Sequence, residues 1–178
     1  RKTRPITLFE GLQTRAPKRT TVAYAKGASY AFEDAGKRDG FAEALALAQK
    51  SDVIIAAMGE RWDMTGEAAS RTSLDLPGNQ QALLEELKKT GKPIILVLMS
   101  GRPNSIEWAD THIDAILHAW YPGTMGGHAI ADVLYGDYNP SGKLPVTFTR
   151  NVGQVPIHYA MKNTGPPIAS GDSGYKKF

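Results

Sequence analysis

The sequence contains no cysteine, which excludes disulfide bonds and thiolate metal sites. No apolar stretch approaches the roughly 20 residues that a membrane helix needs, so we expect no segment that crosses a bilayer. The charges nearly balance, because 21 basic residues against 18 acidic ones leave a formal charge of only +3. That surplus is weak evidence for a nucleic-acid partner. We therefore expect a globular protein that binds neither membranes nor nucleic acids.

Several kinds of active site are missing as well. The histidines show no HxxxH or HxH spacing, so we expect neither a metal nor another cofactor. No GxSxG motif is present, which disfavours a serine hydrolase. The glycines at 121–127 resemble a phosphate cradle before a helix, but they match neither the dinucleotide fingerprint nor the P-loop. Close helix packing is the simpler interpretation of these glycines.

What the sequence does contain is a set of short apolar runs. Three strong runs cover residues 53–58, 94–99 and 115–120, and a weaker one, which is also predicted to be a strand, covers residues 21–25. None of the strong runs alternates apolar with polar residues. Unbroken runs of this length indicate strands that are buried on both faces, as in a parallel sheet covered by helices.

Helical patterns lie between these runs. Apolar residues recur at helical spacing at 41–48, where Asp39 is a candidate N-cap. They recur again at 79–90, where Gly91 is a candidate C-cap. Further helices are predicted at about 127–135 and in the opening segment, whereas the stretch between the second and third strong runs is predicted to be a loop.

The alternation of strands and helices predicts an α/β layered domain with a mostly parallel sheet and right-handed crossovers. Residues 1–153 are predicted to form this domain, with residues 1–20 partly a flanking segment or helix. Residues 154–178 are rich in Pro, Gly and Ser. We predict that they form an irregular C-terminal excursion or linker.

The segment 59–77 is the most informative loop. Ligands of open α/β sheets bind outside the carboxyl ends of the strands, and this loop follows a predicted strand and is long for its position. It contains Glu60, Arg61, Trp62, Asp63, Glu67 and Arg71. Carboxylates accept hydrogen bonds from sugar hydroxyls and aromatic rings stack on pyranose faces. The composition suits carbohydrate binding, although an ordinary charged surface loop is the alternative.

Several motifs follow one another in a distinctive order. They read DVIIAAMGE at 52–60, GEAASR at 66–71, LDLP at 74–77, GKP at 91–93, SGRP at 100–103, AWYPG at 119–123 and GDYNPSGKLP at 136–145. Together they resemble the C-terminal α/β sandwich domain of family 3 glycoside hydrolases, over about residues 5–165. Within that family the resemblance is to bacterial periplasmic or secreted β-glucosidases.

The resemblance implies a three-layer α/β/α sandwich and an active site shared by two domains. In the family an N-terminal (β/α)8 barrel supplies an aspartate nucleophile, and the sandwich begins with an apolar strand and a Gly-Pro turn. Neither is present in this sequence, so we expect a fragment that lacks the barrel and the first strand of the sheet. Its expected partners are that barrel and a carbohydrate substrate, and the fragment alone is not expected to hydrolyse glycosides. A periplasmic or secreted location is also implied.

The resemblance further implies that the sandwich supplies the general acid/base of a retaining β-glycosidase acting on terminal, non-reducing β-D-glucosyl residues. The family pattern of Glu, then Arg, then Leu-x-Leu-Pro places this role on Glu67, with Glu60 as the rival in the same loop. A general acid working near neutral pH benefits from partial burial at a domain interface, because burial raises the pKa of a carboxyl group.

Other loop residues are candidates for contacts with substrate. Trp62 and Met64 are candidate walls on the leaving-group side. Arg71 is a further substrate-binding candidate, although it and Asp75 are expected mainly to hold the loop.

Two other functions remain open. The domain is alternatively a non-catalytic carbohydrate-binding α/β module. The second alternative is a family 3 enzyme of different specificity, such as a β-xylosidase or an N-acetylglucosaminidase. In the glucosaminidase branch the proton donor comes from the barrel, so the intact Glu67 motif argues against that branch.

Overall fold

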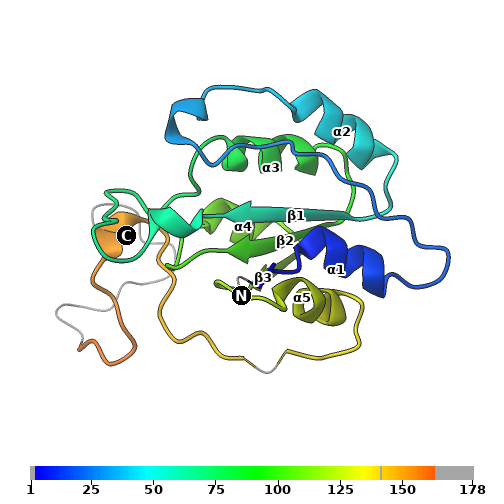
Figure 1. The fold of residues 1–178 in the computed structure, drawn as a ribbon. Helices are drawn as coiled ribbons and strands as arrows, with labels where there is room; N and C mark the ends of the chain where they lie inside the picture. The colour runs from blue at the N-terminus through cyan, green and yellow to red at the C-terminus, as the bar shows by residue number, and fades with distance from the viewer. Residues whose placement is uncertain (1–2, 141, 163–178) are drawn as a thin grey trace.

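The computed structural model describes residues 3–140 and 142–162 (Figure 1). At its centre is a parallel sheet of β1 (Ile54–Gly59), β2 (Ile94–Met99) and β3 (Ala115–His118), in that spatial order. The strands fall within one residue of the ends of two strong apolar runs and inside the third. The predicted parallel sheet is therefore confirmed.

The central strand β2 explains why these runs do not alternate. Leu96, Val97 and Leu98 have no exposed surface, although successive side chains of a strand point to opposite faces. Leu96 pairs in register with Ala56 of β1 and Ile116 of β3. A strand with neighbours on both edges and helices over both faces has no side left for polar residues.

Helices cover both faces of the sheet. Within the described residues they are α1 (Leu8–Arg15), α2 (Phe41–Gln49), α3 (Gln80–Lys88), α4 (Glu107–His112) and α5 (Gly126–Leu134), with 3₁₀ turns at Phe32–Asp34, Trp62–Met64 and Val152–Gln154. Figure 1 shows α2 and α3 over one face and α1 and α5 over the other, which is the expected three-layer α/β/α sandwich. The apolar stripe of α3, made by Leu83, Leu84 and Leu87, is buried in the core.

The helix α4 corrects the prediction of a loop between the second and third strong runs. It is six residues long, and only Ala109 in it is fully buried. So short an element shows no apolar period that would identify it in the sequence. Two parallel strands nevertheless need a crossover connection, and α4 is part of the one between β2 and β3.

The prediction of a strand at residues 21–25 is wrong. This segment has no regular secondary structure, and Tyr24 in it is 65% exposed. A strand needs a neighbour to take its backbone hydrogen bonds, and within the described sheet β1 pairs only with β2. Among the described residues, the segment therefore has no strand paired with it.

Two predicted helix caps are also wrong. The N-cap of α2 is Gly40 rather than Asp39, and it provides no side-chain hydrogen bond. The C-cap of α3 is Lys89 rather than Gly91. Gly91 lies two residues further on; it has a left-handed φ of +72°, and its N–H donates to the carbonyl of Lys88 at 3.2 Å.

Glycines bring α1 and α5 into close contact. A Cβ atom added at Gly127 would overlap the carbonyl oxygen of Thr7, and one added at Gly11 would overlap the carbonyl oxygen of Gly127. The N–H of Gly127 donates to the carbonyl of Ile6 at 3.2 Å, and that of Gly126 to the carbonyl of Gly123 at 3.2 Å. These amides at the start of α5 thus already have backbone acceptors. This agrees with close helix packing, whereas a phosphate cradle would need amides that are free to bind the phosphate.

We expect Gly127→Ala to lower the free energy of unfolding by roughly 1–3 kcal/mol, the usual cost of overpacking. Gly36→Ala is the matched control, because no atom lies within 4 Å of a Cβ at that position. Its stability should stay the same or rise by up to about 1 kcal/mol. Urea unfolding followed by circular dichroism measures both, and equal stabilities would contradict the close helix contact.

Residues 142–162 form an extended segment whose only regular element is the last 3₁₀ turn. Phe148 in it packs edge-on against His118 of β3, with 5.0 Å between ring centroids. The boundary predicted between residues 153 and 154 stays a prediction. Residues 163–178 of the predicted excursion lie outside the described residues.

Candidate active site

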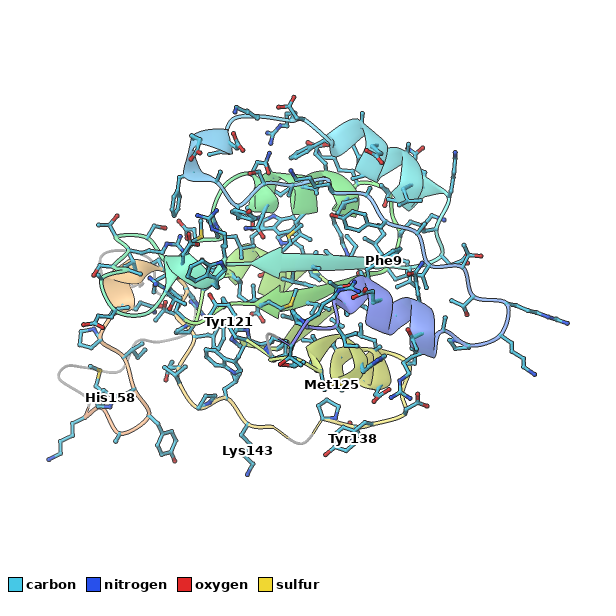
Figure 2. The ribbon with its side chains drawn as sticks, viewed as in Figure 1. Phe9, Tyr121, Met125, Tyr138, Lys143 and His158 are labelled. Carbon is cyan, nitrogen blue, oxygen red and sulfur yellow. The ribbon has the colours of Figure 1, made fainter. Side chains whose placement is uncertain are left out.

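The carboxyl ends of the three strands bring three loops together. The loop 59–77 follows β1, residues 100–103 follow β2, and residues 119–125 follow β3. The hydroxyl of Tyr121, labelled at this edge of the sheet in Figure 2, donates to the carbonyl of Arg61 at 3.1 Å. The third loop is thereby bonded to the first, at the edge where the sequence predicts ligand binding.

A buried amide closes the base of loop 59–77. The Oε1 of Gln80 accepts from the N–H of Gly59 at 2.7 Å, and its Nε2 donates to the carbonyls of Gly59 and Pro77, each at 2.8 Å. Gln80 is 5% exposed, so water competes little for these bonds. The two ends of the loop are held together, and the residues between them project from the edge of the sheet.

Glu60 lies at the start of this loop and is enclosed by protein. Its side chain has no exposed surface and contacts the guanidinium of Arg71, while the Nε of Arg102 lies 3.2 Å from its Oε1. The two arginine side chains are themselves only 7% and 16% exposed. Buried charges are tolerated when they are paired in this way, so this carboxylate serves as an internal counter-ion.

Arg102 also holds the two arms of the loop around Glu67. Its Nη2 donates to the carbonyl of Met64 at 2.6 Å and to that of Ala69 at 3.0 Å, and these carbonyls stand on either side of Glu67. One guanidinium nitrogen thus ties both arms. We refer to this group of three charged side chains as the loop anchor: Glu60, Arg71 and Arg102.

Glu67 lies in the tight turn 66–69 at the tip of the loop. The N–H of Ala69 donates to the carbonyl of Gly66 at 3.3 Å. Gly66 and Ala68, on either side of Glu67, have φ of +110° and +60°, and positive φ is uncommon for a residue such as alanine. The Glu67 side chain is exposed and makes no hydrogen bond or ion pair to the described residues. The anchored loop therefore presents a free carboxylate at the edge of the sheet.

The remaining candidates are not all brought together. Met64 and Arg71 line a cavity of about 340 Å³ between the loop and residues 30–33. Trp62 is 78% exposed and does not line that cavity. The structure thus groups two of the three residues predicted to bind substrate, and leaves Trp62 projecting from the loop.

Arg71 and Asp75 both stabilise the loop. The Nη2 of Arg71 donates to the carbonyl of Asp75 at 2.8 Å, in addition to the contact with Glu60. The carboxylate of Asp75 accepts from the hydroxyl of Ser73 at 2.8 Å. These contacts agree with the expected role of both residues in holding the loop.

Three residues of this edge were missed by the sequence analysis. Arg102 belongs to the SGRP motif, and its position directly after the buried central strand was the available signal. Tyr30 and Phe32 line the cavity from a segment about thirty residues upstream of the loop. Nothing in the local sequence of that segment indicates that it meets the loop.

Other chemistry has little support at this edge. Among residues 3–140 and 142–162, no group of three or more His, Asp or Glu side chains is placed to hold a metal. The described helices are all too short or too polar to cross a bilayer. His118 packs against the rings of Trp120 and Phe148, and burial lowers the pKa of its imidazole.

One protein-family model matches almost the entire sequence. The model of the glycosyl hydrolase family 3 C-terminal domain matches residues 1–177. The chain belongs to glycosyl hydrolase family 3. The resemblance noted in the sequence motifs is thereby confirmed.

Relatives of this family 3 domain carry two kinds of name. A periplasmic β-glucosidase of Salmonella typhimurium is 44% identical over 91% of the chain, and a β-xylosidase of Formosa agariphila is 41% identical over 86%. The chain spans only 23% and 21% of their respective lengths. Both relatives are therefore several times longer than this chain.

Solved structures give the same result. A β-glucosidase from Erythrobacter marinus superposes with a TM-score of 0.86 at 38% identity, covering 96% of this chain and 26% of that one. A β-glucosidase from Listeria innocua, in complex with gluconolactone, superposes with a TM-score of 0.82 at 31% identity, covering 98% and 24%. The family 3 sandwich matches about a quarter of each of these chains.

Proposed function

We propose that this family 3 domain supplies the general acid/base of a retaining β-glycosidase, and that Glu67 is that residue. The observation that carries the proposal is the contrast between the two carboxylates of the loop. Glu67 is exposed at the tip, with no partner among the described residues, whereas Glu60 is enclosed in the loop anchor. A proton donor has to reach the oxygen of a glycosidic bond, and the Glu67 carboxyl group is free to do so.

The chemistry requires a second carboxyl group. Retaining hydrolysis uses two, about 5–5.5 Å apart, one as nucleophile and one as proton shuttle. The protonated Glu67 carboxyl would donate to the departing glycosidic oxygen while the nucleophile attacks the anomeric carbon. The resulting carboxylate would then take a proton from the water that hydrolyses the glycosyl-enzyme. We propose that the nucleophile comes from an N-terminal (β/α)8 barrel of the same protein, facing this edge of the sheet.

The substrates we propose are terminal, non-reducing β-D-glucosyl residues. The names of the Salmonella, Erythrobacter and Listeria relatives support this choice. A β-xylosidase is the second candidate, because the Formosa relative of that name is nearly as similar as the Salmonella β-glucosidase. The Salmonella relative is named as periplasmic, which supports a periplasmic or secreted location for this protein.

The test is the reaction of the full-length protein that contains this domain. It is expected to hydrolyse 4-nitrophenyl β-D-glucoside with a higher kcat/KM than the matching β-D-xyloside. Proton NMR during the first minutes should show β-glucose before mutarotation forms the α-anomer, because double displacement retains configuration. Initial release of α-glucose would contradict a retaining mechanism. Binding of glucosides without turnover would indicate a carbohydrate-binding module instead.

A further inference from the structure

The cavity of about 340 Å³ beside loop 59–77 has the size of a binding site for a small ligand. One wall is the segment 30–33, in which Tyr30 and Phe32 are 45% and 56% exposed. The other wall is the loop itself, including Met64. The volume lies within the range of pockets for small ligands, roughly 300–1,000 Å³.

The aromatic wall is fixed in place next to the loop. The N–H of Ser29 donates to the Oδ1 of Asn79 at 2.7 Å, and the N–H of Asn79 donates to the carbonyl of Ser29 at 3.1 Å. Asn79 is 3% exposed and directly precedes α3, close to the end of the loop. This buried pair of bonds attaches the segment 30–33 to the same helix that closes the base of the loop.

A guanidinium group lies over each aromatic ring. Arg61 is 5.2 Å from the ring centroid of Tyr30, and Arg71 is 5.3 Å from that of Phe32. Arg61 is itself paired with Asp63, and Arg71 belongs to the loop anchor. Cation–π contacts of this kind orient the rings before any ligand arrives. The exposed rings are therefore preorganised surfaces rather than freely rotating side chains.

The charges in the lining are largely compensated within the protein. The guanidinium of Arg61 is paired with Asp63 and lowers the pKa of that carboxyl group, and the charge of Arg71 is paired with that of Glu60. Glu33 adds one exposed carboxylate. Such a lining offers both donors and acceptors with little net charge. It suits a neutral ligand with several hydroxyl groups and an apolar face, because the C–H face of a pyranose packs on the negative face of an aromatic ring.

The loop that carries the proposed proton donor also lines the cavity. Met64 and Ala69 both line it; they precede and follow Glu67 in the chain, and Arg102 holds their carbonyls. The donor acts on the oxygen between the sugar under attack and the group that leaves. The sugar under attack has to contact the nucleophile, which lies outside this chain. A cavity on the donor's own loop is therefore placed to receive the leaving side of the substrate.

We propose that this cavity binds the leaving group of the glycosidic substrate as a neutral sugar unit, with Tyr30 and Phe32 as residues that determine specificity for it. The inference rests on the proposed role of Glu67. It goes beyond that role by identifying which part of this domain contacts the departing sugar and by what chemistry.

The experiment compares two substrates of the full-length protein. Cellobiose leaves a glucose unit, which would occupy the cavity, whereas methyl β-D-glucoside leaves methanol, which is too small to touch both rings. For Tyr30→Ala and Phe32→Ala we expect kcat/KM on cellobiose to fall roughly fivefold to tenfold, the value of one aromatic contact. The rate on methyl β-D-glucoside should stay within about twofold, since the donor and its loop are unchanged.

Controls separate binding from folding. Tyr138→Ala removes an aromatic ring that is 61% exposed but lies on the α5 side of the molecule, away from the cavity (Figure 2), and should leave both rates unchanged. Tyr30→Phe keeps the aromatic face and should restore most of the cellobiose rate. Phe32→Leu fills similar space without an aromatic face, and it should not restore the cellobiose rate. These two variants keep the test possible if truncation to Ala prevents folding.

The outcomes are distinct from those that test the proposed function. Equal losses on cellobiose and methyl β-D-glucoside would overturn the inference, because the rings would then support the loop rather than bind sugar. Unchanged rates on both substrates would overturn it as well. A failure of the proposed function would instead appear in the unmodified protein, as hydrolysis of neither substrate, or in Glu67→Gln, as an unchanged rate.

Discussion

Glu67→Gln in the full-length protein is expected to lower kcat/KM on glucosides with poor leaving groups by about 10²–10⁴-fold, the usual contribution of general acid/base catalysis. Glutamine keeps the size of the side chain but has no proton of suitable acidity to give. Activated phenols depart without protonation, so aryl β-glucosides with acidic phenols should lose much less. A series of such substrates, graded by the acidity of the phenol, measures the effect as a steeper dependence on the leaving group.

The second half of the reaction gives an independent measurement. Hydrolysis of the glycosyl-enzyme needs a base to activate water, whereas azide attacks without one. Added azide should therefore restore turnover of Glu67→Gln on activated substrates and produce β-glucosyl azide. Glu43→Gln on α2, another exposed glutamate, is the matched control and should behave like the unmodified protein. A near-normal rate for Glu67→Gln on poor leaving groups would transfer the role to Glu60 or to a residue of the barrel.

Glu60→Gln is expected to act on stability, lowering the free energy of unfolding of this chain by about 3–5 kcal/mol, the usual cost of removing one partner from a buried ion pair. It leaves the guanidinium groups of Arg71 and Arg102 buried without their shared negative charge. Glu67→Gln makes the same chemical change in the same loop, but at an exposed side chain. Its stability should therefore stay within about 0.5 kcal/mol of the unmodified chain. Urea unfolding of the two variants measures the difference.

The pair of substitutions distinguishes two roles that the sequence alone leaves open. Glu67→Gln should retain stability and lose catalysis that azide restores, whereas Glu60→Gln should lose stability, with no rescue by azide. If Glu60→Gln unfolds like the unmodified chain and azide restores its activity, the two assignments have to be exchanged. The loop anchor also connects the two effects, because a proton donor works only when it is held within a fraction of an ångström of its productive position.

The layered architecture was readable from the sequence because its signals are local. Each strong apolar run lies within a short window, and the burial of Leu96, Val97 and Leu98 on both faces of β2 accounts for the lack of alternation. The leucine stripe of α3 has the same local character. Strongly patterned elements such as these can be recognised without knowledge of the rest of the fold.

The misplaced elements depend on neighbours instead. Residues 21–25 have the composition of a strand but no strand beside them within the described sheet. The helix α4 is too short to show a period, and it exists as part of the crossover between two parallel strands. In both cases the backbone hydrogen bonds available from the rest of the fold decided the outcome, and that information is not present in a local window.

At the candidate site the sequence by itself determined which loop matters, because a long polar loop after a buried strand lies at the ligand edge of such a sheet. It supplied two glutamates in that loop, chemically identical and seven positions apart. Only the tertiary structure made them different, by placing Arg102 from the end of β2 beside Glu60 and leaving Glu67 at the tip. Tyr30 and Phe32 likewise reach the loop only through packing. Burial and charge pairing arise from contacts between segments far apart in the chain, and so they follow from the fold.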